Sequence, residues 1–170
     1  MLTAVIVIGL AVAMMVGPIM MIQPSKGQRA LTALREKAQM SGLKIRMVPN
    51  TQKKGAQFLA MYLQPLDVPK KATQPIKVML ERKNYSHGLH FDKEWALSSP
   101  TTFTPLLEQT LKDLVQRLPH TVMGISIQQA EVGLLWTERQ RKGTDIDNDL
   151  TLISQALNEL KRAVEQGIER

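Results

Sequence analysis

The stretch VMGISIQQAEVGLLWTE, residues 122–138, contains two short apolar runs on either side of Gln129-Ala130. Both runs are rich in aliphatic and branched side chains, and each has the length of a strand. The polar break between them is short enough to be the turn of a hairpin. We therefore predict a strand pair whose turn lies at Gln129-Ala130.

Three segments upstream also have the character of strands. Residues 43–47, LKIRM, alternate apolar and basic side chains, as in a strand with one wet face. Residues 56–63 and 76–80 are rich in aromatic and branched residues. The loop between them holds three prolines, which cannot donate a hydrogen bond to a sheet, and residues 84–88, NYSHG, predict a turn.

Helical periodicity marks three further segments. Ser25 and Gln28 form a capping box for a helix over residues 26–40, which Gly42 ends. Thr104-Pro105 opens a second helix, and the last helix has an apolar stripe of Leu150, Ile153, Leu157, Leu160 and Val164. The aspartates of DIDND, Asp147 or Asp149, are read as its N-cap.

The order of these elements predicts an α+β fold with a mostly antiparallel sheet of about five strands. Two or three helices are expected to cover one face of the sheet. The expected domains are a transmembrane helix over residues 2–22, a basic juxtamembrane helix over residues 23–42 and a soluble α+β domain over residues 43–170.

Residues 2–22 are predicted to span a membrane. The run has no charged side chain, and 21 residues of helix are about 30 Å long, the thickness of the bilayer's hydrocarbon core. A cleaved signal peptide is one alternative, because AVA at residues 11–13 resembles a cleavage site, but the positive n-region is missing. A buried core helix is another, although cores rarely supply so long an uncharged run.

Basic side chains follow this run at once. Residues 23–54 hold the whole formal net charge of +7, whereas residues 55–170 carry equal numbers of acidic and basic side chains. Basic residues beside a span stay in the cytoplasm, so the domain is expected inside and the N-terminus outside. The residues expected to set this topology, or to attract anionic lipid, are Lys26, Arg29, Arg35 and Lys37.

Small residues recur every four positions in the apolar run, at Gly9, Ala13 and Gly17. On a helix they share one face, and small faces let another membrane helix, or a second copy, approach closely. The basic charge does not favour nucleic acid, because it lies beside the apolar run and no nucleic-acid-binding motif is present.

The search for catalytic chemistry finds little. His87, His90, Asp92 and Glu94 lie close together in HGLHFDKE, but their spacing suits a polar hairpin edge better than a metal site. DIDND departs from a calcium loop because Leu150 occupies the glycine position. No catalytic residues, metal site or cofactor is predicted.

The segment IQPSKGQRALTALREKAQMSG resembles the start of the small membrane-anchored auxiliary subunit of the bacterial preprotein translocase. Gln23, Pro24, Gln28 and Arg29 match that family's pattern, and the resemblance covers residues 2–45. It implies a single-pass protein of the bacterial inner membrane with a small cytoplasmic domain.

Two functions from different classes remain open. The first is a non-catalytic accessory or scaffold protein that engages the bilayer and another membrane protein, with the translocase as one partner. The second is a membrane-tethered enzyme with an unrecognised site in the α+β domain. The lack of a clustered nucleophile, base and acid in the sequence favours the first.

Overall fold

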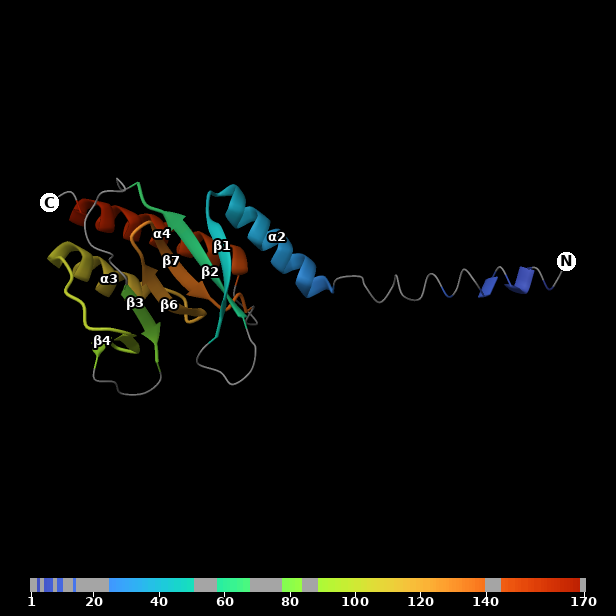
Figure 1. Ribbon diagram of the computed structural model, residues 1–170, viewed down its shortest axis with the longest axis horizontal. Helices are drawn as coiled ribbons and strands as arrows, with labels where there is room; N and C mark the ends of the chain where they lie inside the picture. The colour runs from blue at the N-terminus through green and yellow to red at the C-terminus, as the bar shows by residue number, and fades with distance from the viewer. Residues whose placement is uncertain are drawn as a thin grey trace. The chain divides into compact units, whose positions relative to one another are not determined.

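The computed structural model describes residues 25–50, 58–67, 78–83, 89–139 and 145–168, with a few residues between Thr3 and Met14. The chain is divided into two compact units, residues 1–34 and residues 35–170. The larger unit contains a seven-stranded sheet in the order β1-β2-β7-β6-β3-β5-β4 (Figure 1). Every strand pair in it is antiparallel. The strands are β1 (Lys44–Pro49), β2 (Phe58–Pro65), β3 (Val78–Arg82), β4 (His90–Asp92), β5 (Trp95–Leu97), β6 (Val122–Ile127) and β7 (Glu131–Trp136).

The β6–β7 hairpin lies at the centre of the sheet, and its prediction is confirmed. Gln128 N–H donates to the Glu131 carbonyl at 2.8 Å and closes the turn at Gln129-Ala130. Ile125 faces Leu134 and Ile127 faces Val132 across the pair, and all four side chains are fully buried. Strands β2 and β3 then flank the hairpin on its two sides.

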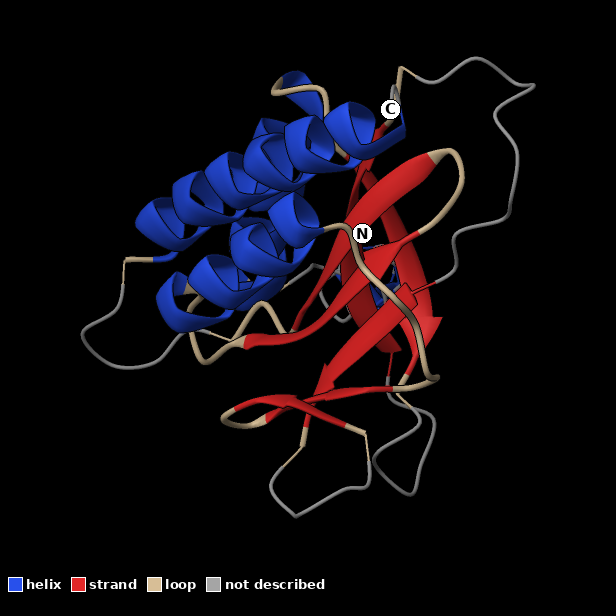
Figure 2. Ribbon diagram, turned by 90° about the vertical axis from the view of Figure 1, so that its left-hand side faces the viewer, coloured by secondary structure: helices blue, strands red, loops and turns tan. Residues whose placement is uncertain are grey.

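Helices α3 (Pro105–Arg117) and α4 (Ile146–Ile168) lie together on one face of the sheet, as expected (Figure 2). In their apolar stripes, the side chains of Leu111, Leu114, Ile153 and Leu157 are at most 1% exposed. The Thr104 hydroxyl accepts from Leu107 N–H and confirms the predicted cap. The expected cap of α4 was misplaced by two residues or more, because the Asp145 carboxylate accepts from Asp147 N–H at 3.0 Å.

Helix α2 (Lys26–Met40) begins in the smaller unit and ends in the larger one. The predicted capping box is present, since Ser25 N–H donates to the Gln28 side chain at 2.8 Å and Gln28 N–H to Ser25 Oγ at 3.3 Å. Gly42 ends the helix with φ of +83°, a conformation that glycine adopts without strain. The last six residues of α2 pack in the larger unit, where Ala38 is fully buried.

The expected fold class needs two corrections. The sheet has seven strands and not about five, because the β4–β5 hairpin forms two strands of three residues each, too short for a periodic signal. The expected transmembrane helix over residues 2–22 is not part of the fold: within the described part of the chain, no helix is long and apolar enough to cross a bilayer. Most of residues 2–22, and the turn expected at residues 84–88, lie outside the described residues.

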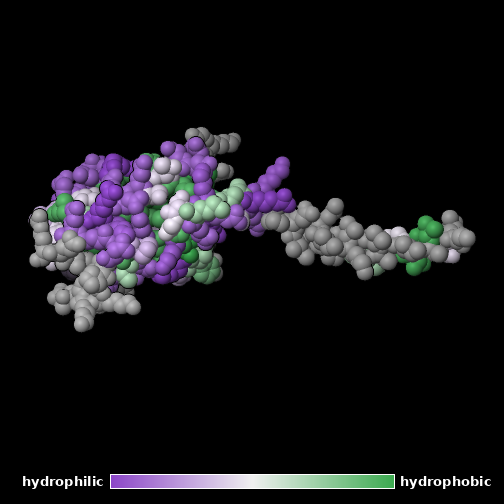
Figure 3. Space-filling view, turned by 90° about the horizontal axis from the view of Figure 1, so that it is seen from above, coloured by the Kyte–Doolittle hydropathy of each residue, from purple (hydrophilic) through white to green (hydrophobic). Residues whose placement is uncertain are grey.

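Side-chain alternation separates the two faces of the sheet. Tyr62 and Gln64 of β2 point to the helix side, because Gln64 Nε2 donates to Asn158 Oδ1 of α4 at 2.7 Å. On the other face, Leu63 lies over Gly133, where an added Cβ would stand 2.6 Å from Leu63 Cδ2. The surface of the sheet unit that Figure 3 shows is mostly hydrophilic, with smaller hydrophobic areas.

Candidate functional site

A buried carboxylate joins three distant parts of the larger unit. Glu138, just after β7, is 8% exposed and accepts from Arg35 Nε at 2.9 Å and Arg35 NH2 at 2.5 Å. Tyr62 of β2 donates its hydroxyl to Glu138 Oε1 at 2.8 Å. We call these three residues the Glu138 cluster. It places a fork-like, charge-assisted pair and a phenol around one buried anion.

The backbone at Glu138 is unusual. Its φ is +52°, in the left-handed region that a residue with a side chain occupies at a cost of roughly 1–2 kcal/mol. The hydrogen bonds from Arg35 and Tyr62 hold the side chain in this position. Local geometry at the end of β7 is therefore determined by residues that lie more than 70 positions away in the sequence.

Electrostatics in the Glu138 cluster keep each group in the form that its neighbours need. The hydrogen bonds to Glu138 raise the pKa of Arg35, so the guanidinium stays charged. Burial, reinforced by Glu138, raises the pKa of Tyr62 far above its ordinary value, so the phenol stays a neutral donor. The Trp136 ring packs 5.2 Å from the Tyr62 ring, and its buried indole N–H has no hydrogen-bond partner among the described residues.

The Glu138 cluster fastens the end of α2 to the sheet. Lys37, two residues after Arg35, adds a second link to Asp147 at the start of α4, with 2.7 Å between Nζ and Oδ1. Both side chains of the Lys37–Asp147 pair are exposed, so this pair contributes much less to the stability of the fold than the buried pair of Arg35 and Glu138. In this arrangement the carboxylate accepts hydrogen bonds from both the phenol and the guanidinium. Such mutual pairing is typical of a cluster that stabilises the fold.

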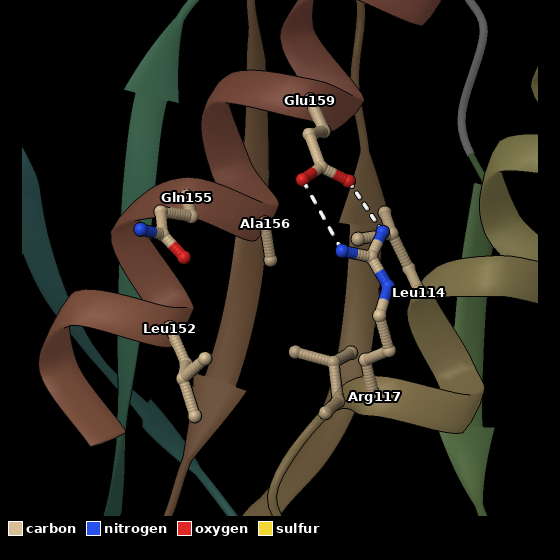
Figure 4. A pocket seen from close by; sticks show the side chains of 7 residues that line it. Leu114, Arg117, Leu152, Gln155, Ala156 and Glu159 are labelled. Atoms are coloured by element: carbon tan, nitrogen blue, oxygen red, sulfur yellow. Dashed lines mark hydrogen bonds and ion pairs between the residues drawn. The ribbon is translucent and has the colours of Figure 1, made fainter. Parts of the chain in front are cut away.

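Between α3 and α4 lies a shallow groove, shown in Figure 4. Arg117 of α3 and Glu159 of α4 point toward each other across it and form a two-pronged ion pair, at 2.5 and 3.3 Å. Its lining residues are Leu114, Arg117, Leu118, Leu152, Gln155, Ala156 and Glu159. A second, more open depression that shares the Arg117–Glu159 pair includes Thr110, Asp113, Arg162 and Gln166. The walls of both depressions combine apolar surface with paired charges.

Arg82 of β3 lies beside Trp95 of β5, toward the β4 edge of the sheet. The Arg82 guanidinium stands 4.9 Å over the Trp95 ring and donates to the Pro119 carbonyl at 3.2 Å. Burial lowers its pKa, while Glu94 at 3.5 Å opposes that shift. Glu94, one of the four candidate metal ligands, is therefore engaged with Arg82.

The remaining metal candidates do not assemble in the described part of the chain. His90 and Asp92 lie in β4, and His87 falls outside the described residues. Over the ranges that the structure describes, no group of three or more histidine, aspartate or glutamate side chains is placed to hold a metal ion.

The structure divides the four cations expected at the membrane into two kinds. Arg35 and Lys37 are held in ion pairs inside the larger unit. Lys26 and Arg29 lie in the first turn of α2, are exposed, and make no ion pair with any described residue. Of the expected small-residue face, Gly9 has open space around it, and Ala13 and Gly17 fall outside the described residues.

No family model matches the chain, and searches of curated proteins and of solved structures find no significant match. The resemblance to the translocase subunit therefore stays a prediction. The Glu138 cluster was not predicted, because its members lie in three separate elements and no local pattern links them.

Removing the charge of Arg35 is expected to destabilise the protein strongly. In Arg35→Met the buried Glu138 carboxylate loses its countercharge, so the free energy of unfolding should fall by about 2–3 kcal/mol, a value reduced for the partial exposure of Arg35. The control Lys37→Met removes an exposed pair on the same helix and should cost less than about 1 kcal/mol. Urea unfolding measures both, and equal losses would contradict the assignment of Glu138 as the main attachment.

Tyr62 is expected to resist ionisation at high pH. Its pKa is raised in the folded state, so its contribution to stability is full below the ordinary pKa of 10.0 and declines as pH rises above it. In a Tyr85→Phe chain Tyr62 is the remaining tyrosine, and absorbance at 295 nm should report phenolate only as the fold is lost. Ionisation near pH 10 with the fold intact would contradict this buried hydrogen bond.

Proposed function

We propose that this protein is a non-catalytic accessory protein of the bacterial inner membrane, in which the sheet unit binds another membrane protein. The observation that carries the proposal is the division of the cations of α2. Arg35 and Lys37 fasten the end of the helix to the sheet unit, while Lys26 and Arg29 stay exposed next to the uncharged sequence. One helix thus links a lipid-compatible sequence to a folded binding unit.

The charge distribution supports an orientation. Residues 23–54 carry the net charge of +7, and the rest of the sheet unit is balanced. Basic residues next to an apolar stretch are retained in the cytoplasm, so the sheet unit is placed there in this proposal. Lys26 and Arg29 are also available to anionic headgroups, at about 1 kcal/mol for each basic residue near the surface.

The arginines support binding over catalysis. Arg35, Arg82 and Arg117 each contact a carboxylate of the same unit, so their charges serve the fold. In an active site such groups would converge on an open space where a substrate is bound. The resemblance in residues 2–45 makes the preprotein translocase the first partner to test.

The orientation can be tested with a reporter enzyme that is active only outside the cytoplasm. Fused after Arg170, it should be inactive, because the basic flank retains the sheet unit inside. A cytoplasm-active reporter at the same position is the matched control and should be active. Activity of the outside reporter would overturn the orientation.

The partner can be tested by crosslinking in bacterial membranes. The full chain should give a specific crosslinked product with a membrane protein, which mass spectrometry identifies, and deletion of residues 1–23 should reduce its yield at least tenfold. Lys37→Met keeps the apolar sequence and should keep the product. If no specific product forms with the intact chain, the accessory function is wrong.

A further inference from the structure

We propose that the outer edge of β1 accepts an extended segment of a partner protein in which acidic and apolar side chains alternate. This inference rests on the proposed accessory function and names the surface and the chemistry of the partner. It follows from three properties of this edge: the regular backbone of β1, the exposed side chains of Met47 in β1 and Phe58 in β2 on one face, and the basic side chains of β1 on the other.

The two edges of the sheet differ in their capacity to pair. β4 is three residues long, its register with β5 shifts between His90 and Asp92, and Lys93 follows with φ of +47°. Short and irregular edges of this kind resist the addition of a strand. β1 is six residues long and pairs with β2 in unbroken register from Lys44 to Pro49. Within the described sheet, β2 is its one neighbour, so the outer edge of residues 44–48 is a regular template for another strand, and Pro49, which has no N–H to donate, ends it.

The helix-side face of β1 carries exposed apolar surface. Met47 faces Ala60 of β2, which lies two residues from Tyr62 and so on the helix side. Phe58, two residues before Ala60, lies on the same face. Met47 is 45% exposed and Phe58 is 60% exposed, so both leave apolar surface open on this face. An incoming strand would bury this surface with its own apolar side chains.

The other face of β1 is basic. Lys44 and Arg46 alternate with Ile45 and Met47 and are both exposed. Arg46 NH1 reaches Glu131 of β7 at 2.9 Å but keeps 55% of its side chain exposed, and Lys44 makes no ion pair with any described residue. Directly opposed residues of neighbouring strands share a face, so a partner strand would place acidic side chains beside Lys44 and Arg46.

Charge also discriminates between partners. A second copy of β1 would bring its own Lys44 and Arg46 to the basic face, and like charges across a strand pair are destabilising. An acidic segment would form favourable charge pairs with Lys44 and Arg46, whereas a second copy would add repulsion. The occupant is therefore a different protein with an alternating acidic and apolar segment.

The probe is a blocked seven-residue peptide in which Glu alternates with Val, added to the full chain in detergent micelles. It should slow hydrogen exchange at amides of residues 44–48, and a peptide with Lys in place of Glu should bind at least tenfold more weakly. Lys44→Glu should shift the preference between the two peptides by at least tenfold toward the Lys peptide. A Glu peptide with N-methylated alternate amides should not bind, because it cannot complete the ladder.

Two methionines provide a matched comparison. Met47→Gln removes apolar surface at the edge and should weaken the Glu peptide about tenfold, whereas Met40→Gln, at a residue 88% exposed outside β1, should leave its affinity unchanged. Equal binding of both peptides, or no protection of β1 by either, overturns the proposal. Protection that rises with protein concentration alone identifies a second copy as the occupant and also overturns it. If crosslinking to a membrane partner persists while the peptide fails, the accessory function stands and this edge is not its contact.

Discussion

The larger unit depends on the burial of one charge. Glu138 is a carboxylate at 8% exposure, and an ion in that environment is stable only when strong donors replace water. Arg35 and Tyr62 supply these donors from two elements that are distant in sequence. The need to satisfy Glu138 therefore holds the last turns of α2 through Arg35, and it fixes how β7 leaves the sheet and which way the Tyr62 phenol points.

Because Glu138 needs a countercharge, the basic side chains of α2 do more than supply positive charge. If all four cations of residues 26–37 faced solvent, the helix would be interchangeable with any basic linker. Arg35 and Lys37 instead contact Glu138 and Asp147 within the larger unit.

The sheet shows a similar division of roles. Its centre, the β6–β7 hairpin, is buried on the helix side by aliphatic side chains of α3 and α4. One edge, β4, is short and irregular, and the other, β1, is regular and carries Met47, Lys44 and Arg46. Charged side chains and proline discourage unspecific pairing at an edge, so Lys44, Arg46 and Pro49 restrict β1 to an added strand of complementary charge in the proposed interaction. The asymmetry separates a protected side of the unit from one suited to a partner.

Local sequence determined most of the individual elements. Apolar periodicity located both hairpin strands at residues 122–136 and the three helices of the sheet unit and its entry segment. Residue types typical of helix ends correctly identified the N-caps at Ser25 and Thr104 and the terminating glycine at Gly42. These features depend on residues within a few positions of one another, so the sequence pattern contains them. The two three-residue strands were missed because so short a run has no period, and the expected transmembrane helix rests on hydropathy alone and is not part of the described fold. Only the tertiary structure decided which cation of α2 meets Glu138 and which edge of the sheet stays regular, because these contacts join residues up to 103 positions apart and no local pattern encodes such a pairing.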